Sequence, residues 1–223
     1  MVKYSTKPKT YLAPKQRKVM VGQVVRRRGA YPEYTLEDAL AVLFLAKEPI
    51  GRKQISEILE LGEGSVRTLL GRLTKKDLIR SKQRGHFLTT WGHEVKKKIE
   101  ELFSEPIEVT VDGFPGVAII VKNPGGFKSL ELRDEAIKFD AKGAMILTVK
   151  NGEIVFPEDS RPLKEMYPEI VKRLYDYEEG DLIVITWADK IGRALKAALH
   201  VAVVLKGDQL PREILEVAEW SSR

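Results

Sequence analysis

The sequence predicts an α+β protein in two parts: a helical N-terminal half, then a two-layer sandwich of helices on a mainly antiparallel sheet. Apolar residues recur at helical spacing across 35–103. Beyond that stretch the pattern changes to short β-branched runs, and Asn151-Gly152, the strongest short hairpin signal in the chain, lies between two of them. We therefore expect two domains, 34–104 and 105–223.

Three helices are expected at the start of the helical half. The first begins at Thr35, whose hydroxyl can cap it, and ends at Pro49 and Gly51. The second is short, and a turn at 60–62 leads into the third. In each helix the apolar residues fall on one face, which predicts that this face is buried. The inward-facing residues are expected to be Leu36, Ala39, Leu40, Leu43, Phe44, Ile55, Ile58, Leu59, Val66, Leu69, Leu70 and Leu73.

A hairpin and a further helix complete this half. Short apolar runs at 78–81 and 87–89 flank a turn at Arg84-Gly85. The last helix is expected from about residue 91 to residue 103.

Three helices, a two-stranded hairpin and a trailing helix, in this order, resemble the winged helix-turn-helix domains of bacterial and archaeal transcriptional regulators. The stretch 61–73 looks like the turn and recognition helix of that family. Residues 78–80 and 87–92 look like the two wing strands and the entry to the final helix. Asp77 departs from the family, which most often has a glycine there, but Asp tolerates the left-handed conformation better than most residues.

The resemblance implies that the third helix enters the major groove of DNA and that the wing reaches the neighbouring minor groove or backbone. Arg67 is the candidate for bidentate contact with a guanine. The predicted DNA-binding residues are Ser65, Arg67, Thr68, Arg72, Lys75, Lys82 and Arg84. The alternative is a helical domain whose solvated surface charges contact protein or RNA in a larger assembly.

Basic residues are concentrated in the first half. The chain carries 38 Lys and Arg against 32 Asp and Glu, a net charge of +6. Up to Ser104 there are 22 basic and 11 acidic residues (net +11), and after it 16 and 21 (net −5). Counterion release favours binding of a polyanion to the basic half, so double-stranded DNA is its expected partner. The acidic half would repel the same partner.

Residues 1–33 form a basic N-terminal arm in this interpretation. No acidic residue occurs from Met1 to Pro32. We expect disorder up to about Pro14, and an ordered apolar segment at 19–25 that packs on a partner subunit. The arm would follow the DNA backbone; the alternative is a solubilising tail.

The second half reads as strand-strand-helix, repeated in outline, with a further strand and helix. Strands are expected at 107–111, 117–121, 145–149, 154–156 and 182–187, and helices at 130–139, 162–174 and 191–205. This arrangement is similar to small ligand-binding or dimerisation domains. The chain as a whole resembles an archaeal family that joins a winged helix to such a domain.

The sequence contains no pattern that indicates catalysis. The three histidines, His86, His93 and His200, lack the spacing of a zinc protease, and no phosphate-binding loop is found. The absence of cysteine excludes thiol nucleophiles and thiolate metal sites. We therefore expect no enzyme and no cofactor or metal. No apolar run reaches the roughly 18 residues that span a bilayer, so we expect a cytoplasmic protein with no membrane partner.

One candidate ligand site remains, at the junction of the last strand and the alanine-rich helix. Trp187 and Asp189 lie there, and Asp189 is the expected N-cap. Arg161 is a further candidate, if the fold brings it near this junction. The alternative is that Asp189 only caps the helix and Trp187 only packs in the core. The sequence thus predicts a homodimeric DNA-binding transcriptional regulator whose second half senses a small-molecule effector or mediates dimerisation.

Overall fold

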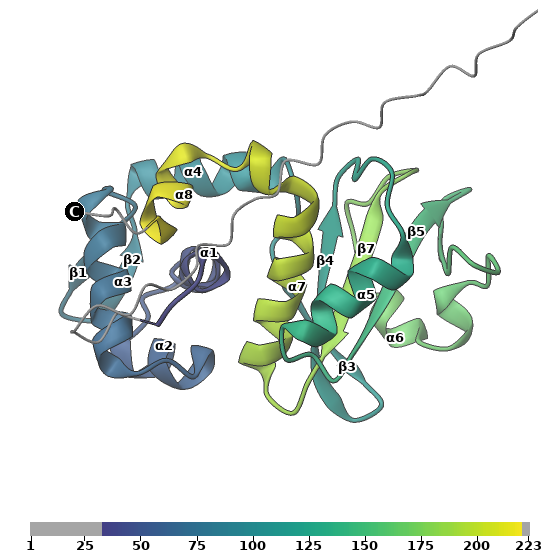
Figure 1. Cartoon of the computed structure of the whole chain (residues 1–223), viewed down its shortest axis with the longest axis horizontal. Helices are drawn as coiled ribbons and strands as arrows, with labels where there is room; N and C mark the ends of the chain where they lie inside the picture. Colours follow the sequence, from purple (N-terminus) through teal and green to yellow (C-terminus); the bar gives the residue numbers. More distant parts are fainter. Residues whose placement is uncertain (1–32, 220–223) are drawn as a thin grey trace, which may run out of the picture. The chain divides into compact units, whose positions relative to one another are not determined.

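The computed structural model describes residues 33–219 (Figure 1). The predicted arm lies outside the described residues except for Glu33, and so does its apolar segment 19–25. No helix within the described range is both long enough and apolar enough to cross a bilayer.

The helical half follows the predicted order of elements. These are α1 (Leu36–Leu45), α2 (Arg52–Leu59), α3 (Glu63–Lys75), β1 (Ile79–Lys82), β2 (Gly85–Leu88) and α4 (Thr90–Glu100). Thr35 caps α1 as expected, and the Asp38 carboxylate in turn accepts a hydrogen bond from the Thr35 N–H, 2.9 Å. Asp77 has φ of +54°, the left-handed conformation predicted before the first strand of the hairpin.

The second half contains an antiparallel sheet. Its elements are β3 (Ile107–Val111), β4 (Phe114–Val121), α5 (Ser129–Lys138), β5 (Gly143–Lys150), β6 (Glu153–Val155), α6 (Pro168–Val171), β7 (Leu182–Trp187), α7 (Ile191–Lys206) and α8 (Arg212–Ala218). The strand order is β3-β4-β7-β5-β6 and every neighbouring pair is antiparallel. The fold is therefore α+β, as predicted.

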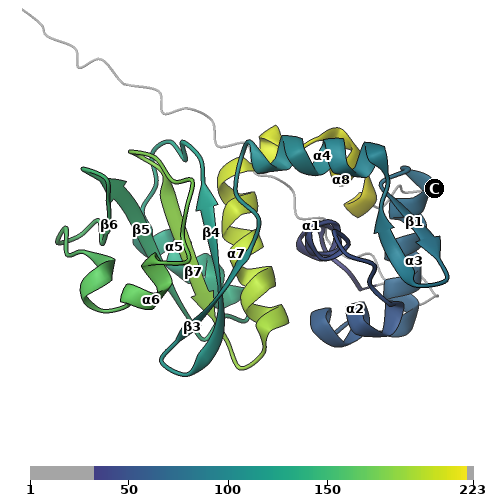
Figure 2. The same cartoon turned by 180° about the vertical axis from the view of Figure 1, so that it is seen from behind.

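The two faces of this sheet are covered differently. The long helices α5 and α7 pack on one face, which Figure 1 shows in front of and beside β4 and β7. The short α6 and the 3-10 turn Leu163–Glu165 cover the other face, seen in Figure 2. The sequence predicted one helix over 162–174 and helices on a single face. Pro168 starts a new helix there because it has no N–H to continue an earlier one.

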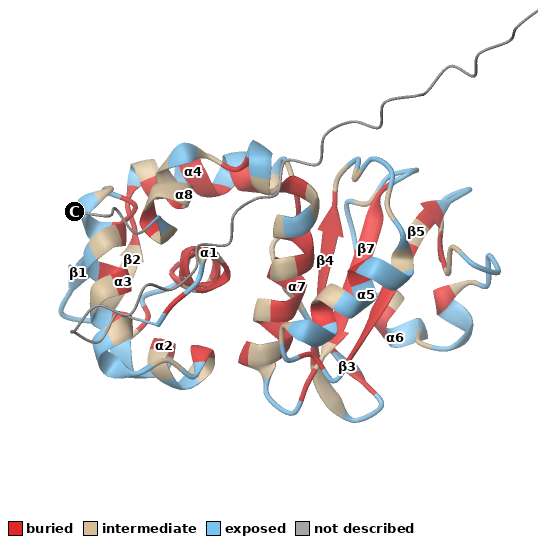
Figure 3. Ribbon diagram, viewed as in Figure 1, coloured by how far each residue is buried: buried red, intermediate tan, exposed pale blue. Residues whose placement is uncertain are grey.

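Figure 3 shows buried residues along most of β4 and β7, the central strands of the sheet. β4 begins at Phe114, three residues before the strand expected at 117–121, so the turn that precedes it is only Asp112-Gly113. Pro115 is tolerated in the strand because the pairing of β4 with β7 ends at Gly116, so the missing N–H of Pro115 removes no bond of that ladder. The Pro115 carbonyl still accepts a hydrogen bond from the Ala188 N–H.

The hydrophobic core continues across residue 104. One cluster of buried side chains includes residues of α1, α7, α8 and the sheet. α7 contacts α1 and α2, and α8 contacts α1 and α3. At one such contact a Cβ on Gly192 would lie 1.6 Å from the Ile58 carbonyl oxygen, so only glycine allows this approach of α7 to α2.

Candidate nucleic-acid interface and groove

The exposed side of α3 carries two cations and two glycines. The predicted inward set, Val66, Leu69, Leu70 and Leu73, is buried. Arg67 and Lys75 are exposed on the opposite side of the helix. Gly64 precedes Arg67 by three residues, and Gly71 lies four residues from each cation, so all four residues follow one side of the helix. Glycine is a poor helix former, costing about 1 kcal/mol relative to alanine in a helix interior.

The fold does not require glycine at these two positions. A Cβ built on Gly64 or Gly71 has no described atom within 4 Å, and neither residue has a positive φ. Gly71 lies in the helix interior and therefore lowers helix stability, and neither glycine relieves a contact within residues 33–219. They leave a strip of bare backbone beside Arg67, where a large partner can approach the helix closely.

Three of the predicted DNA-binding residues make hydrogen bonds within the protein. Ser65 Oγ accepts from the Glu33 N–H at 3.0 Å, and Thr68 Oγ1 donates to the Gly64 carbonyl at 3.0 Å. Arg72 Nη1 donates to the carbonyl oxygens of Val217 (3.0 Å) and Glu219 (2.9 Å).

Arg72 therefore fastens the C-terminal end of α8 to α3, and its guanidinium also lies 5.9 Å from the centre of the Tyr34 ring. This contact could not be foreseen, because α8 itself was not predicted from the sequence.

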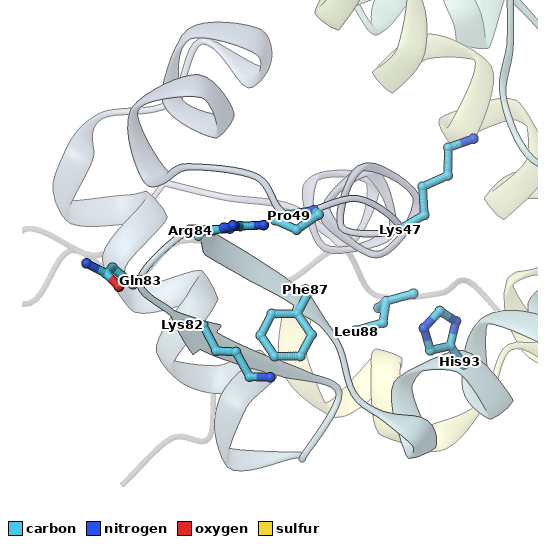
Figure 4. A pocket seen from close by; sticks show the side chains of 9 residues that line it. Lys47, Pro49, Lys82, Gln83, Arg84, Phe87, Leu88 and His93 are labelled. Atoms are coloured by element: carbon cyan, nitrogen blue, oxygen red, sulfur yellow. The ribbon is translucent and has the colours of Figure 1, made fainter.

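The β1–β2 hairpin forms one wall of a basic hollow. The hollow has a volume of about 490 Å³, and Figure 4 shows the side chains around it. Lys82 Nζ lies 4.9 Å from the centre of the Phe87 ring, a cation–π contact. The hollow is lined by Lys47, Pro49, Lys82, Gln83, Arg84, Gly85, Phe87, Leu88 and His93.

The basic side chains around the hairpin affect the pKa of His86 and have few counter-charges. Burial and then the positive charge of Arg52 hold the pKa of His86 below its ordinary value, so this imidazole is neutral at physiological pH. Among residues 33–219, no carboxylate forms an ion pair with Arg52, Arg67, Lys82 or Arg84. Within the described residues these four side chains therefore have no carboxylate partner, and a polyanion would supply the counter-charge.

The predicted ligand-site residues are only partly brought together. Trp187 and Arg161 line the same groove, of about 440 Å³, beside β5. Asp189 does not: its Oδ1 accepts from Lys142 Nζ at 2.9 Å. The prediction that Asp189 caps α7 is wrong, because Lys190 is the N-cap residue, and within the described chain no side chain makes the capping bond.

His200 joins three helices through a cluster that the sequence did not predict. Its Nδ1 lies 2.9 Å from Glu37 Oε1 of α1, and its Nε2 3.4 Å from Glu135 Oε2 of α5. The ring stacks on Phe139, with centroids 4.1 Å apart. Burial disfavours the charged imidazole, but the two carboxylates outweigh it and raise the pKa of His200. A single histidine in an alanine-rich helix gives no sequence signal for these partners.

Comparison with known proteins assigns both halves to families. Residues 35–94 match the PH0730-like N-terminal domain, and residues 112–205 match a domain of unknown function, DUF4443. No curated protein matches the chain. A solved structure, the hypothetical protein PH0730 from Pyrococcus horikoshii OT3, is similar to this chain with 68% sequence identity and a TM-score of 0.80; the match covers 83% of this chain and 100% of that one. With this identity and coverage, the chain belongs to the PH0730-like family.

Proposed function

We propose that the protein is a transcriptional regulator that binds double-stranded DNA through a winged helix, with α3 in the major groove. The observation that carries this proposal is the exposed strip of α3, where Gly64 and Gly71 leave bare backbone next to Arg67. The major groove is wide enough to admit a helix, and close approach of the backbone lets short side chains reach base edges.

Arg67 is the residue proposed to read sequence, through a bidentate contact with guanine. Lys75 is proposed to meet phosphate, which positions the helix without reading bases. In the hairpin, Lys82 and Arg84 are exposed beside a hollow whose other charged side chains include Lys47. These two side chains are proposed to contact the backbone next to the groove that α3 occupies.

Arg72 has a different role in this proposal from the DNA contact that the sequence predicted. Its bonds to the Val217 and Glu219 carbonyls hold α8 against α3. We infer that it supports the position of the recognition helix from behind. Ser65 and Thr68 remain close to the proposed DNA face. The Ser65 hydroxyl accepts its present bond and keeps a proton to donate, and the Thr68 hydroxyl donates its present bond and can still accept, so both can contribute to DNA contact.

Gel-shift titrations with selected genomic fragments at two salt concentrations test the DNA-binding proposal. Arg67→Ala is expected to cost about 1–3 kcal/mol and to relax sequence preference, whereas Arg84→Ala should weaken all sequences alike. Arg173→Ala, an exposed arginine of the sheet-containing half, is the matched control and should change nothing. Affinity unchanged in both Arg67→Ala and Arg84→Ala would remove the DNA-facing assignment. Preferential binding of RNA in the same assay would support the adaptor alternative.

The sheet-containing half is proposed to bind an effector in the groove beside β5 or to join two copies of the chain. The groove brings together Trp187 and Arg161. Glu37 of α1 and Glu135 of α5 both contact His200, so a shift of α5 on effector binding would alter a contact that α7 makes with α1 in the helical half. An effector can shift DNA binding only if it binds the two states with different affinity.

A further inference from the structure

Part of strand β5 has an unpaired edge. The Val149 N–H donates to the Asp181 carbonyl at the start of β7, 3.0 Å. Hydrogen bonds to one neighbouring strand recur at every second residue, so the backbone groups of Ala144 and Ile146 point away from β7. On that side β6 pairs only with 148–150, and none of the residues in 33–219 pairs with Ala144 or Ile146.

The sequence explains why β6 stops short of this edge. The β5–β6 register pairs Thr148 with Val155, and its continuation would place Pro157 opposite Ile146. Proline has no N–H and cannot donate to Ile146, so the ladder ends. The chain then forms its own loop, in which the Phe156 N–H donates to the Arg161 carbonyl at 3.0 Å.

The unpaired edge forms the floor of the groove beside β5. One wall is α5, with Ser129, Leu130 and Arg133. The other wall contains aromatic and apolar side chains from the segment that follows β6, and Trp187 also lines the groove. The remaining lining residues are Ala144, Met145, Ile146, Phe156, Glu158, Arg161, Met166 and Tyr167.

Two features of this groove indicate what it binds. Unpaired backbone N–H and C=O groups at residues 144 and 146 have the spacing that only another extended backbone matches repeatedly. At the rim, Leu130 is 67% exposed, and Arg133 forms no ion pair with any carboxylate in the described part of the chain. An added strand with an apolar residue toward Leu130 and a carboxylate toward Arg133 would satisfy both.

We propose that the groove binds an extended peptide segment of a partner protein, which pairs with Ala144 and Ile146 as an additional β-strand. A second copy of the chain is a poorer match for this edge. Ala144 and Ile146 are each only 5% exposed, recessed between the two walls, and the same edge of a second copy would be recessed equally. Two recessed edges cannot meet. A single strand can enter between the walls once it displaces the hydrogen bond that the Ser129 hydroxyl donates to Glu158 across the groove.

This inference names the effector class for the sheet-containing half, and it does not depend on DNA binding by the helical half. Gel shifts report on the DNA-binding proposal alone. Peptide binding is measured separately, so one can fail while the other stands.

The test selects peptides from a random twelve-residue phage-display library on the full-length protein and measures their affinity by fluorescence anisotropy. Leu130→Asp on the groove wall is expected to weaken a selected peptide by about tenfold or more. Ile137→Asp, on the same helix and 43% exposed but outside the groove lining, is the matched control and should leave the affinity within about twofold. Both positions are exposed, so neither variant is expected to unfold the protein.

Methylation of single peptide amides then tests strand addition itself. Each methyl group removes one N–H, and a paired strand should lose about tenfold in affinity at every second residue and little at the residues between. Ala144→Pro removes the groove-facing N–H of the protein and should weaken binding, whereas Ala144→Ser keeps this N–H and should not.

The proposal is overturned if no selected peptide is sensitive to Leu130→Asp, or if sensitivity to methylation shows no two-residue period. A non-peptidic metabolite that raises the melting temperature and is blocked by Leu130→Asp, with no peptide selected, would also overturn it in favour of a small-molecule site.

Discussion

Replacing Gly71 by alanine should make the protein more stable. Gly71 lies in the interior of α3, its φ is not positive, and a Cβ there would have no described atom within 4 Å. Alanine gains helix propensity and restricts the unfolded chain, which together contribute about 0.5–1 kcal/mol. For a protein of this size, about 1 kcal/mol corresponds to a rise in Tm of roughly 2–4 °C.

Two other helical glycines provide the opposite control. A Cβ on Gly92 would lie 1.9 Å from the Leu78 carbonyl oxygen, and one on Gly192 would lie 1.6 Å from the Ile58 carbonyl oxygen. Alanine at either position forces backbone apart and should destabilise by about 1–3 kcal/mol or more. Urea unfolding and thermal melts of the three alanine variants measure this contrast directly.

The same position then tests function. Gly71→Leu adds bulk into open space, so the free energy of unfolding should not fall, while DNA affinity should drop because the helix can no longer approach the groove. A fall in stability for Gly71→Ala would refute the argument that the fold leaves this glycine unconstrained. Higher stability together with unchanged DNA affinity for Gly71→Leu would show that this strip of α3 is not the DNA face.

Three further outcomes are expected. The pKa of His200 is raised in the folded state, so the stability that its ion pairs contribute is fully present below pH 6.5, its ordinary pKa, and is lost as the pH rises through the folded-state pKa. The pKa of Glu37 is lowered in the folded state, so the stability that it contributes is present above about pH 4.5, its ordinary pKa, and is lost as the pH falls through the folded-state pKa. His200→Gln should therefore reduce the free energy of unfolding most between about pH 4.5 and 6.5, and a deficit that grows toward pH 9 in urea titrations would contradict this. Arg72→Ala should cost about 1–2 kcal/mol in the same titrations, because the Val217 and Glu219 carbonyls lose their donor, yet it should leave DNA sequence preference unchanged. Light scattering should give a homodimer, and a mass of 25.2 kDa at micromolar concentration would rule one out.

Local patterns predicted most of the secondary structure. The stripe Val66, Leu69, Leu70 and Leu73 is buried as its spacing requires, and β3 and β7 have their predicted bounds. These elements have strong periodicity or continuous β-branched runs, and neighbouring residues alone determine such signals. The short α8 was missed because a helix of this length depends on packing against α1 and α3 rather than on its own propensity.

For the candidate sites too, some features follow from the sequence and others only from tertiary contacts. The sequence by itself determined which side of α3 is polar, where its two glycines lie and that positive charge is concentrated in the first half, because these follow from order along the chain. Only the tertiary structure decided that Arg72 is held by α8, that Asp189 pairs with Lys142 and not with the helix end, and that His200 lies between two carboxylates. It also decided that the edge of β5 stays open beside Pro157. Pro157 ends the hairpin ladder locally, but only the strand order leaves no other described strand beside that edge. The contacts of Arg72, Asp189 and His200 instead join residues far apart in sequence, whose approach is set by packing of the whole core and leaves no trace in any local pattern.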